Sequence, residues 1–213
     1  MQAGITVEKG ENIDLGKLAW TPVRKGSQLW DIGIPNRNAS EFFMADQRRD
    51  PEISLKYATL FPDDITYTIG KSDYSKDWFF QHVPHNTDPE AKSAPFFGIR
   101  ATGRATPYTI VFDLPAAPKG KAILRFAICG TGTRNVDVTV NGKPAGQLDR
   151  LPGDGVITNH GSQGIWYERE LEFDAALMKQ GTNKIVLTVP AGPVNNGMMY
   201  DYIRLELDEN VSI

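Results

Sequence analysis

A carboxylate stands where an apolar side chain is expected in the last predicted strand. Alternation along residues 198–207 turns Asp201 toward the same side as Ile203 and Leu205, the side expected to face the core. An unpaired carboxylate in an apolar interior is costly, so Asp201 needs hydrogen-bond donors, an arginine or a cation. Two interpretations stay open: a hydrogen-bonded or arginine-paired structural carboxylate, and a ligand of a structural calcium ion.

The calcium interpretation needs further oxygen ligands. Glu41 and Asp46, near the start of the predicted sandwich, are the candidates to join Asp201, because hard cations prefer carboxylate oxygens. A chelator would then lower the melting temperature, and an unchanged melt would exclude the ion.

Three aromatic side chains are candidates for contact with a sugar: Trp166, Tyr200 and Tyr202. Sugars present faces rich in C–H groups that stack on exposed rings. Alternation puts Trp166 and Tyr200 opposite the apolar faces of their strands, so core packing and sugar contact are equally open for them. The Trp-Phe-Phe run at residues 78–80 is expected in the core instead.

Three polar turns precede predicted strands and offer hydrogen bonds to sugar hydroxyls. Their candidate residues are Arg134, Asn135, Asn159, His160, Asn195 and Asn196. In a sandwich such turns can gather at one end and form a loop-edge site. Arg134 would suit a uronate carboxylate, because its planar donors match a carboxylate fork. The competing interpretation is that Asn and Gly serve turn geometry alone.

Patterns typical of catalysis are weak. His82 and His85 lie three residues apart with Asp77 nearby, but this spacing without a third ligand does not define a metal or acid–base site. No serine lies in a nucleophile elbow, and no phosphate loop, dinucleotide fingerprint or zinc ribbon occurs. We therefore expect no catalytic residue in this chain.

Composition excludes several classes of protein. With 23 Lys and Arg against 26 Asp and Glu, the net charge of -3 offers no basic field for nucleic acid. No run is long and apolar enough to predict a membrane span. The single cysteine, Cys129, lies in an apolar run, so we expect a buried side chain rather than a reactive thiol.

Short alternating segments separated by Gly, Pro, Asn and Asp predict an all-β fold. The predicted strands cover residues 65–69, 106–114, 121–129, 135–140, 165–173, 183–189 and 198–207, with weaker ones near Leu18, Leu29 and Gly98. Seven or more such strands indicate a β-sandwich. Residues 174–181 predict one helical turn, with Asp174 as its N-cap and Gly181 after its end.

The same alternation assigns a core. On four of the predicted strands, apolar residues two apart share one face. They are Ile110, Phe112, Leu114, Leu124, Phe126, Ile128, Val136, Val138, Val140, Ile185, Leu187 and Val189.

The opening of the predicted sandwich resembles a known family. The matching motifs are Trp-Asp-Ile-Gly-Ile-Pro-Asn-Arg-Asn-Ala-Ser-Glu-Phe at residues 30–42, Phe-Pro at 61–62, Ile-Gly-Lys-Ser at 69–72 and Asp-Trp at 77–78. They are similar to the start of the C-terminal domain of rhamnogalacturonan lyases of polysaccharide lyase family 4. Three later segments, at residues 138–146, 177–190 and 200–207, resemble the second half of galactose-binding-like jelly rolls.

The resemblance implies a jelly-roll β-sandwich likened to carbohydrate-binding modules, in which an Asp at the place of Asp201 often helps to hold calcium. The family's lysine and histidine, which abstract a galacturonate C5 proton, lie in an N-terminal domain that nothing here matches. The implied function is a non-catalytic module that binds pectic polysaccharide (rhamnogalacturonan I) as the C-terminal part of a lyase. A structural domain that packs on the catalytic domain without binding sugar, and a free-standing small lyase, are the alternatives.

The resemblance also suggests how the chain is organised. Residues 1–28 are expected to be a linker and packing strand from a preceding domain, with Leu18 and Trp20 on the sandwich, and residues 29–213 the jelly roll. Although no signal peptide precedes it, we expect a piece of a secreted protein, extracellular or periplasmic. We expect a monomer whose partners are a pectic glycan and a catalytic lyase domain, with no nucleic-acid or membrane partner.

Overall fold

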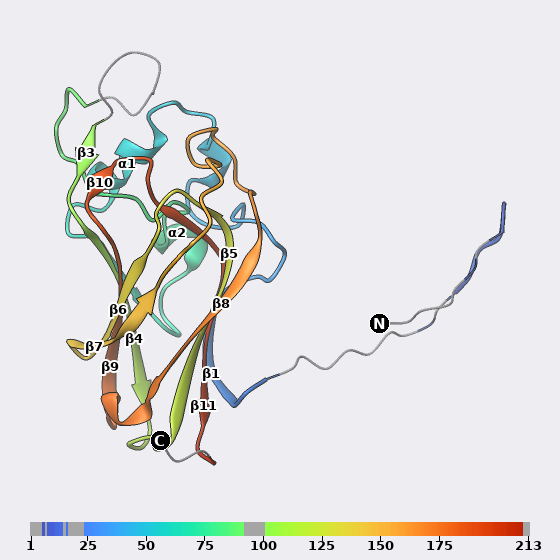
Figure 1. Cartoon of the computed structure of the whole chain (residues 1–213), viewed down its shortest axis with the longest axis vertical. Coiled ribbons are helices and arrows are strands. Elements are labelled where there is room, and N and C mark those ends of the chain that lie inside the picture. Colours follow the sequence, from blue (N-terminus) through green and yellow to red (C-terminus); the bar gives the residue numbers. More distant parts are fainter. Residues whose placement is uncertain (1–5, 7, 15, 17–23, 92–100, 211–213) are drawn as a thin grey trace.

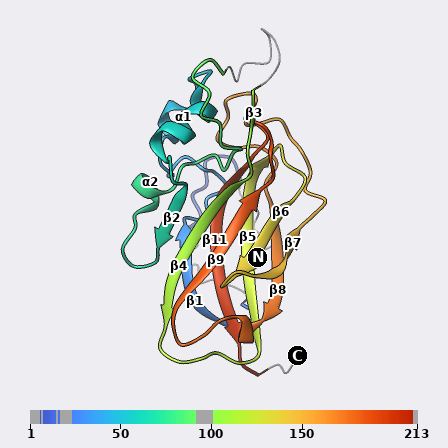
Figure 2. The same cartoon turned by 90° about the vertical axis from the view of Figure 1, so that its left-hand side faces the viewer.

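Two β-sheets packed face to face make up the body of the chain (Figure 1). The computed structural model describes residues 6, 8–14, 16, 24–91 and 101–210. One sheet has the strand order β1 (Ser27–Gly33), β11 (Met198–Asp208), β5 (Lys121–Thr131) and β8 (Tyr167–Asp174). The other has the order β2 (Ile65–Thr68), β4 (Thr106–Leu114), β9 (Gly181–Val189), β6 (Val136–Val140) and β7 (Lys143–Leu148). Figure 2 looks onto the five-stranded sheet, with the four-stranded sheet behind it.

Short elements lie toward the end of the sandwich drawn uppermost in Figure 1. They are the helices α1 (Ile53–Leu60) and α2 (Tyr74–Asp77), the 3-10 turn Ala45–Gln47, and a ladder of β3 (Thr102–Gly103) with β10 (Gly192–Pro193). None of the helices in the described part of the chain is long and apolar enough to cross a membrane.

The predicted turn between β8 and β9 is confirmed as the 3-10 helix Ala175–Leu177. The side chain of Asp174 accepts a hydrogen bond from the backbone N–H of Ala176, at 2.8 Å. Gly181 follows with φ of 80°, a left-handed conformation that favours glycine. The cap and the glycine therefore deliver the chain into the next strand as predicted.

The predicted jelly-roll β-sandwich is confirmed. Each of the seven main predicted strands is present, with ends within two residues of the prediction. The weaker strand near Leu29 is β1, whereas those near Leu18 and Gly98, and the packing of Trp20, fall on residues outside the described part. β7 was not predicted because it is an edge strand whose residues are mostly exposed, so its sequence lacks alternation.

The core predicted by alternation is confirmed, because all of its residues are buried. An aromatic cluster extends this core toward α1. The Trp78 ring lies 5.1 Å from that of Tyr108 and 5.7 Å from that of Tyr200, measured between centroids. The run at residues 78–80 is fully buried, as expected, and so is Cys129, the thiol of which has a pKa raised by burial.

The last strand, β11, is bulged at Asp201. Tyr200 pairs with Ile128 of β5 and Tyr202 pairs with Ala127, so Asp201 is an extra residue without a partner in β5. An extra residue reverses the alternation on one side of it, and Tyr200 consequently faces the core together with Ile128. The prediction that Tyr200 lies opposite the core is therefore wrong.

Candidate functional site

The carboxylate of Asp201 is fully buried and accepts four hydrogen bonds. Its Oδ1 atom accepts from the backbone N–H groups of Asn36 at 3.0 Å, Arg37 at 2.9 Å and Asn38 at 3.3 Å. Its Oδ2 atom accepts from the indole N–H of Trp166 at 2.8 Å. These donors satisfy the buried charge, as the interpretation of Asp201 as a hydrogen-bonded structural carboxylate requires.

The loop that supplies these backbone donors is built by side chains of the opening motif. Asn36 accepts from the backbone N–H of Asn38, and Asn38 accepts from that of Ser40, each at 2.9 Å. These are Asx turns, which bend the chain without help from a regular element. Arg37 adopts a left-handed φ of 68° between them. The motif thus shapes a loop whose N–H groups converge on Asp201.

The three predicted calcium ligands are not gathered into one group. Within the described residues, no cluster of three or more His, Cys, Asp or Glu side chains could hold a metal ion. Glu41 instead accepts hydrogen bonds from the backbone of Ile34 and the side chain of Asn36. Burial, with a further contribution from Asp201, raises the pKa of Glu41. Asp46 is exposed in the 3-10 turn, so the set of Glu41, Asp46 and Asp201 does not fit a calcium site.

A groove runs along the outer face of the four-stranded sheet, with a volume of about 470 Å³. We call it the sheet groove. Its lining residues come from the entry to β1, from β1 itself, β5, β8 and β11, and from the segments beside them: Arg24, Gln28, Asp31, Pro35, Arg125, Ala127, Trp166, Glu168, Tyr202 and Arg204. Two of the predicted sugar-contacting rings, Trp166 and Tyr202, therefore lie in the same groove.

Both rings of the sheet groove are held in place by polar contacts. The guanidinium of Arg37 lies over the Trp166 ring, 4.7 Å from its centre. The indole N–H of the same ring is fixed by its hydrogen bond to Asp201. The hydroxyl of Tyr202 donates to Asp31 at 2.7 Å. Burial, together with this bond, raises the pKa of Tyr202 to about 12. The rings are thus positioned before any ligand arrives.

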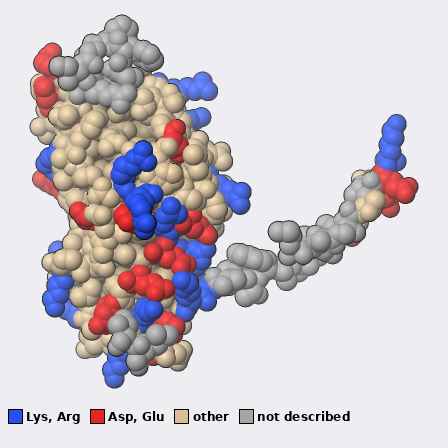
Figure 3. Space-filling view, viewed as in Figure 1, with Lys and Arg blue, Asp and Glu red and all other residues tan. Residues whose placement is uncertain are grey.

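Charges of both signs surround the sheet groove. Its lining includes the cations Arg24, Arg125 and Arg204 and the anions Asp31 and Glu168. Figure 3 shows acidic and basic side chains side by side over the region of β8 rather than one patch of a single sign. A groove with fixed rings and paired donors and acceptors suits a polar ligand that carries apolar ring faces.

The predicted polar turns lie at the end of the sandwich away from the 3-10 turn that joins β8 to β9. The backbone of Gly132, in the turn that carries Arg134 and Asn135, donates to Gly197 and passes close to Asn196. Arg134 donates to the backbone of Leu151, which ties this turn to the loop before β8. The turns before β6 and β11 are thus brought together.

The side chains of these turns differ in exposure. Arg134 and Asn159 are exposed, whereas Asn135, His160 and Asn196 are half-buried. Asn195 is buried and is unsuited to meet a ligand in this conformation. None of the six lines the sheet groove. The loop-edge site stays a prediction separate from the groove.

Tyr200 belongs to the core and not to a binding surface. It is 1% exposed, and its hydroxyl contacts Nδ1 of His82 at 2.9 Å. The other ring nitrogen of His82 lies 2.8 Å from the carbonyl oxygen of Thr106, so Nε2 carries the proton and Nδ1 accepts from Tyr200. Burial lowers the pKa of His82 to about 3. This histidine is therefore a neutral structural group.

His85, the other histidine of the weak catalytic pattern, is also structural. Its Nδ1 atom lies 2.8 Å from a carboxylate oxygen of Asp64, and Arg104 contacts the same carboxylate at 2.9 Å. His82 and His85 are both buried and have separate partners, so their sequence spacing does not create a shared site.

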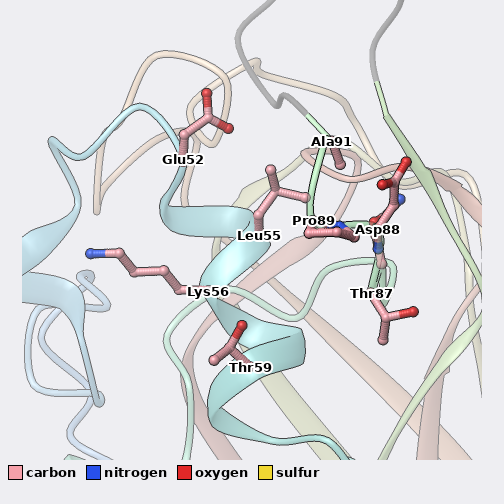
Figure 4. Close-up of a pocket in the computed structure, with 9 residues that line it drawn as sticks. Glu52, Leu55, Lys56, Thr59, Thr87, Asp88, Pro89 and Ala91 are labelled. Atoms are coloured by element: carbon pink, nitrogen blue, oxygen red, sulfur yellow. The ribbon is translucent and has the colours of Figure 1, made fainter.

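A second hollow, of about 340 Å³, lies between α1 and residues 86–91 (Figure 4). Leu55 of α1 points toward Pro89 across it, whereas Lys56 extends away from residues 86–91. The ammonium of Lys56 pairs with Asp50 at 2.6 Å. Among the described residues that line this hollow there is no aromatic ring, which makes it a poorer match for a sugar than the sheet groove.

Alternation places two further groove residues, Arg125 and Arg204, on the outer face but does not mark them as part of a site. Arg125 lies between the core residues Leu124 and Phe126, and Arg204 lies between Ile203 and Leu205. Both must therefore point to the outer face. Nothing in the sequence distinguished them from ordinary surface arginines, because the opposing strands were not known.

The chain matches one family over most of its length. The sequence model described as "CBM-like: Polysaccharide lyase family 4, domain III" matches residues 28–205. A rhamnogalacturonate lyase of Dickeya dadantii is 27% identical over 176 residues, covering 83% of this chain and 27% of the relative. A probable rhamnogalacturonate lyase C of Emericella nidulans is 24% identical over 232 residues, covering 91% of this chain and 22% of the relative. The chain thus spans about a quarter of these relatives.

Solved structures show only distant likeness. A family 36 carbohydrate-binding domain of a xylanase from the hindgut metagenome of Trinervitermes trinervoides is 15% identical, with a TM-score of 0.35. That match covers 61% of this chain and 95% of the other. A family 35 carbohydrate-binding module from Paenibacillus barcinonensis is 18% identical, with a TM-score of 0.34, over 61% of this chain and 91% of the other.

Proposed function

The chain belongs to the family of CBM-like domains III of polysaccharide lyase family 4, and from this premise we propose that it is a non-catalytic module that binds pectic polysaccharide. The ligand is rhamnogalacturonan, and the parent protein is a rhamnogalacturonan lyase whose catalytic domain is a further partner. The names of the curated relatives support this choice of substrate. We place the parent protein outside the cell, where such a glycan is met.

The sheet groove is the observation that carries this proposal. Trp166 and Tyr202 line it together although 36 residues separate them in the sequence, and both are fixed by hydrogen bonds. Fixed rings lose little entropy when a ligand stacks on them. Arginine and carboxylate groups beside them supply donors and acceptors for sugar hydroxyls.

The alternative of a purely structural domain predicts a large exposed apolar patch. In the described part of the chain, the large apolar side chains that are exposed are Ile13, Ile34, Leu60 and Ile165. Four such side chains are few, and exposed apolar residues in small number are ordinary on a protein surface. The alternative of a free-standing lyase is not favoured either, because His82 and His85 are buried in structural contacts.

Native affinity electrophoresis tests the proposal. The wild-type chain is run in gels with rhamnogalacturonan I, with homogalacturonan, and without pectin. We expect selective retardation by rhamnogalacturonan I and a loss of about tenfold in affinity in Tyr202→Ala, as removal of an aromatic contact implies. Ile165→Ala is the matched control, since Ile165 is 54% exposed and outside the sheet groove. Equal mobility of the wild type in all gels would refute glycan binding.

A further inference from the structure

Two arginines that line the sheet groove lie directly opposite each other in the strand register. In the register of the four-stranded sheet, Asp31 pairs with Arg204, Arg204 pairs with Arg125, and Arg125 pairs with Glu170. Side chains of such partners on one face are close neighbours, and like charges placed opposite one another repel. The row therefore has two adjacent cations in the middle and one carboxylate at each end.

The neighbouring carboxylates satisfy Arg125 only in part. Its Nε and Nη2 atoms donate to Glu168 at 3.2 and 2.7 Å. Its Nη1 atom lies 3.7 Å from Glu170, which is longer than a hydrogen bond. One edge of the Arg125 guanidinium therefore has no close acceptor among these ion pairs.

Arg204 is buried with an unmet donor. Its side chain is 9% exposed, and Nη2 forms an ion pair with Glu206. The other oxygen of Glu206 is already used by the backbone N–H groups of Lys25 and Gly26. Nε of Arg204 has no hydrogen-bond partner within the described chain. Oε1 of Glu206 has no hydrogen bond of good geometry among the described residues either, so this buried ion pair is incompletely satisfied, and a buried N–H of a charged group is costly to leave unpaired.

We propose that Arg125 and Arg204 together bind the carboxylate of a galacturonate unit, so that the sheet groove selects acidic over neutral glycans. An incoming carboxylate would screen the repulsion between the two cations and accept from the free edge of the Arg125 guanidinium. The guanidinium carbon of Arg204 lies 5.8 Å from the ring centre of Tyr202, which places the acid group beside a ring that can carry the sugar. This inference rests on the proposed function and names the chemical group that is recognised.

The decisive comparison changes the ligand and leaves the protein intact. Isothermal titration of the wild-type chain is performed with rhamnogalacturonan I oligosaccharides and with the same oligosaccharides after reduction of their carboxyl groups to neutral alcohols. We expect the acidic form to bind at least about tenfold more tightly, as the loss of charged hydrogen bonds implies. Its affinity should also fall with added salt, which screens charge, while that of the reduced form should not.

A variant then assigns the effect to the arginines. Arg125→Gln should bind the two ligand forms with similar affinity, and its thermal melt is recorded to verify folding. Arg150→Gln is the matched control, because Arg150 carries the same charge but is exposed and, within the described residues, forms its ion pair with Asp149. Equal wild-type affinity for acidic and reduced ligands would overturn this inference and leave the proposed function standing. Binding of neither form would overturn both.

Discussion

The indole N–H of Trp166 donates a 2.8 Å hydrogen bond to the buried carboxylate of Asp201. This bond joins a wall of the sheet groove to the bulge in β11. The other oxygen of the same carboxylate binds the backbone of residues 36–38. One buried charge thus positions both a groove ring and the loop that carries Arg37, the cation over that ring.

Replacing Asp201 by alanine should destabilise the fold strongly. The change leaves the indole N–H and the backbone donors of the loop without their acceptor, so we expect a loss of about 2–4 kcal/mol in the free energy of unfolding. Urea denaturation measures it. The control is Asp149→Ala, which removes an exposed surface pair and should change stability by less than about 0.5 kcal/mol. Equal effects of the two substitutions would contradict the role given to Asp201.

Removal of divalent cations should leave the thermal midpoint unchanged. The Asp201 carboxylate is already balanced by N–H donors, and Glu41 and Asp46 do not join it in a cluster. Thermal melts with EDTA and with excess calcium chloride provide the measurement. A lower midpoint in EDTA that calcium restores would reinstate the calcium interpretation.

Gly33 in the opening motif should not tolerate a side chain. Its φ is 88°, and a Cβ atom there would lie 2.5 Å from the backbone oxygen of Asp201. Gly70 has a similar φ of 78° but open space around it, so Gly70→Ala carries only backbone strain of about 1 kcal/mol. We expect Gly33→Ala to cost at least about 1 kcal/mol more than Gly70→Ala in urea denaturation. Similar losses of stability for the two variants would show that the β11 backbone shifts to make room for the added Cβ atom, which would contradict this prediction.

Mild acid should destabilise the protein through His82. Burial lowers the pKa of His82 to about 3 in the folded state, while its pKa in the unfolded state is about 6.5. Between these two pH values the unfolded state binds a proton at this ring and the folded state does not. Stability from this group is complete above pH 6.5 and is lost as pH falls toward 3, at up to about 1.4 kcal/mol per pH unit.

The measurement compares unfolding free energies at pH 7 and pH 5.5 in the wild type and in His82→Gln. We expect the wild type to lose about 1 kcal/mol more than the variant over this interval. In the folded wild type, the ring resonances of His82 should not titrate between pH 7 and pH 5. A folded-state titration near pH 6 would contradict the buried neutral histidine.

Alternation predicted the sandwich and its core because β4, β6 and β9 alternate between buried and more exposed residues, whereas β5 and β11 are buried at most positions. It also marked Asp201 as a buried carboxylate in need of partners. Its partners could not be predicted, since three of them are backbone groups about 165 residues earlier in the chain and the fourth is the indole of Trp166, directly before β8. The bulge that positions Asp201 also turns Tyr200 toward the core, opposite to the side predicted by alternation. No residue type in β11 indicates a bulge at this point.

The candidate site was predicted only in part for a similar reason. Trp166 and Tyr202 were identified by their aromatic character, which is a local property. Arg125 and Arg204 matter because strand register places them opposite each other, and register follows from the whole sheet.

The helix α1 was not predicted because its buried residues do not form a clear apolar stripe.

The most direct test of the central claim is to locate the bound glycan on the protein. Amide and indole N–H resonances of the isotope-labelled chain are followed by NMR during titration with rhamnogalacturonan I oligosaccharides. The account predicts that the largest shifts fall on the indole of Trp166 and on the amides of Tyr202 and Arg204, while residues of α1 stay unchanged. Shifts confined to α1 and residues 86–91, or to the turn at Arg134, would contradict the assignment of the site to the sheet groove.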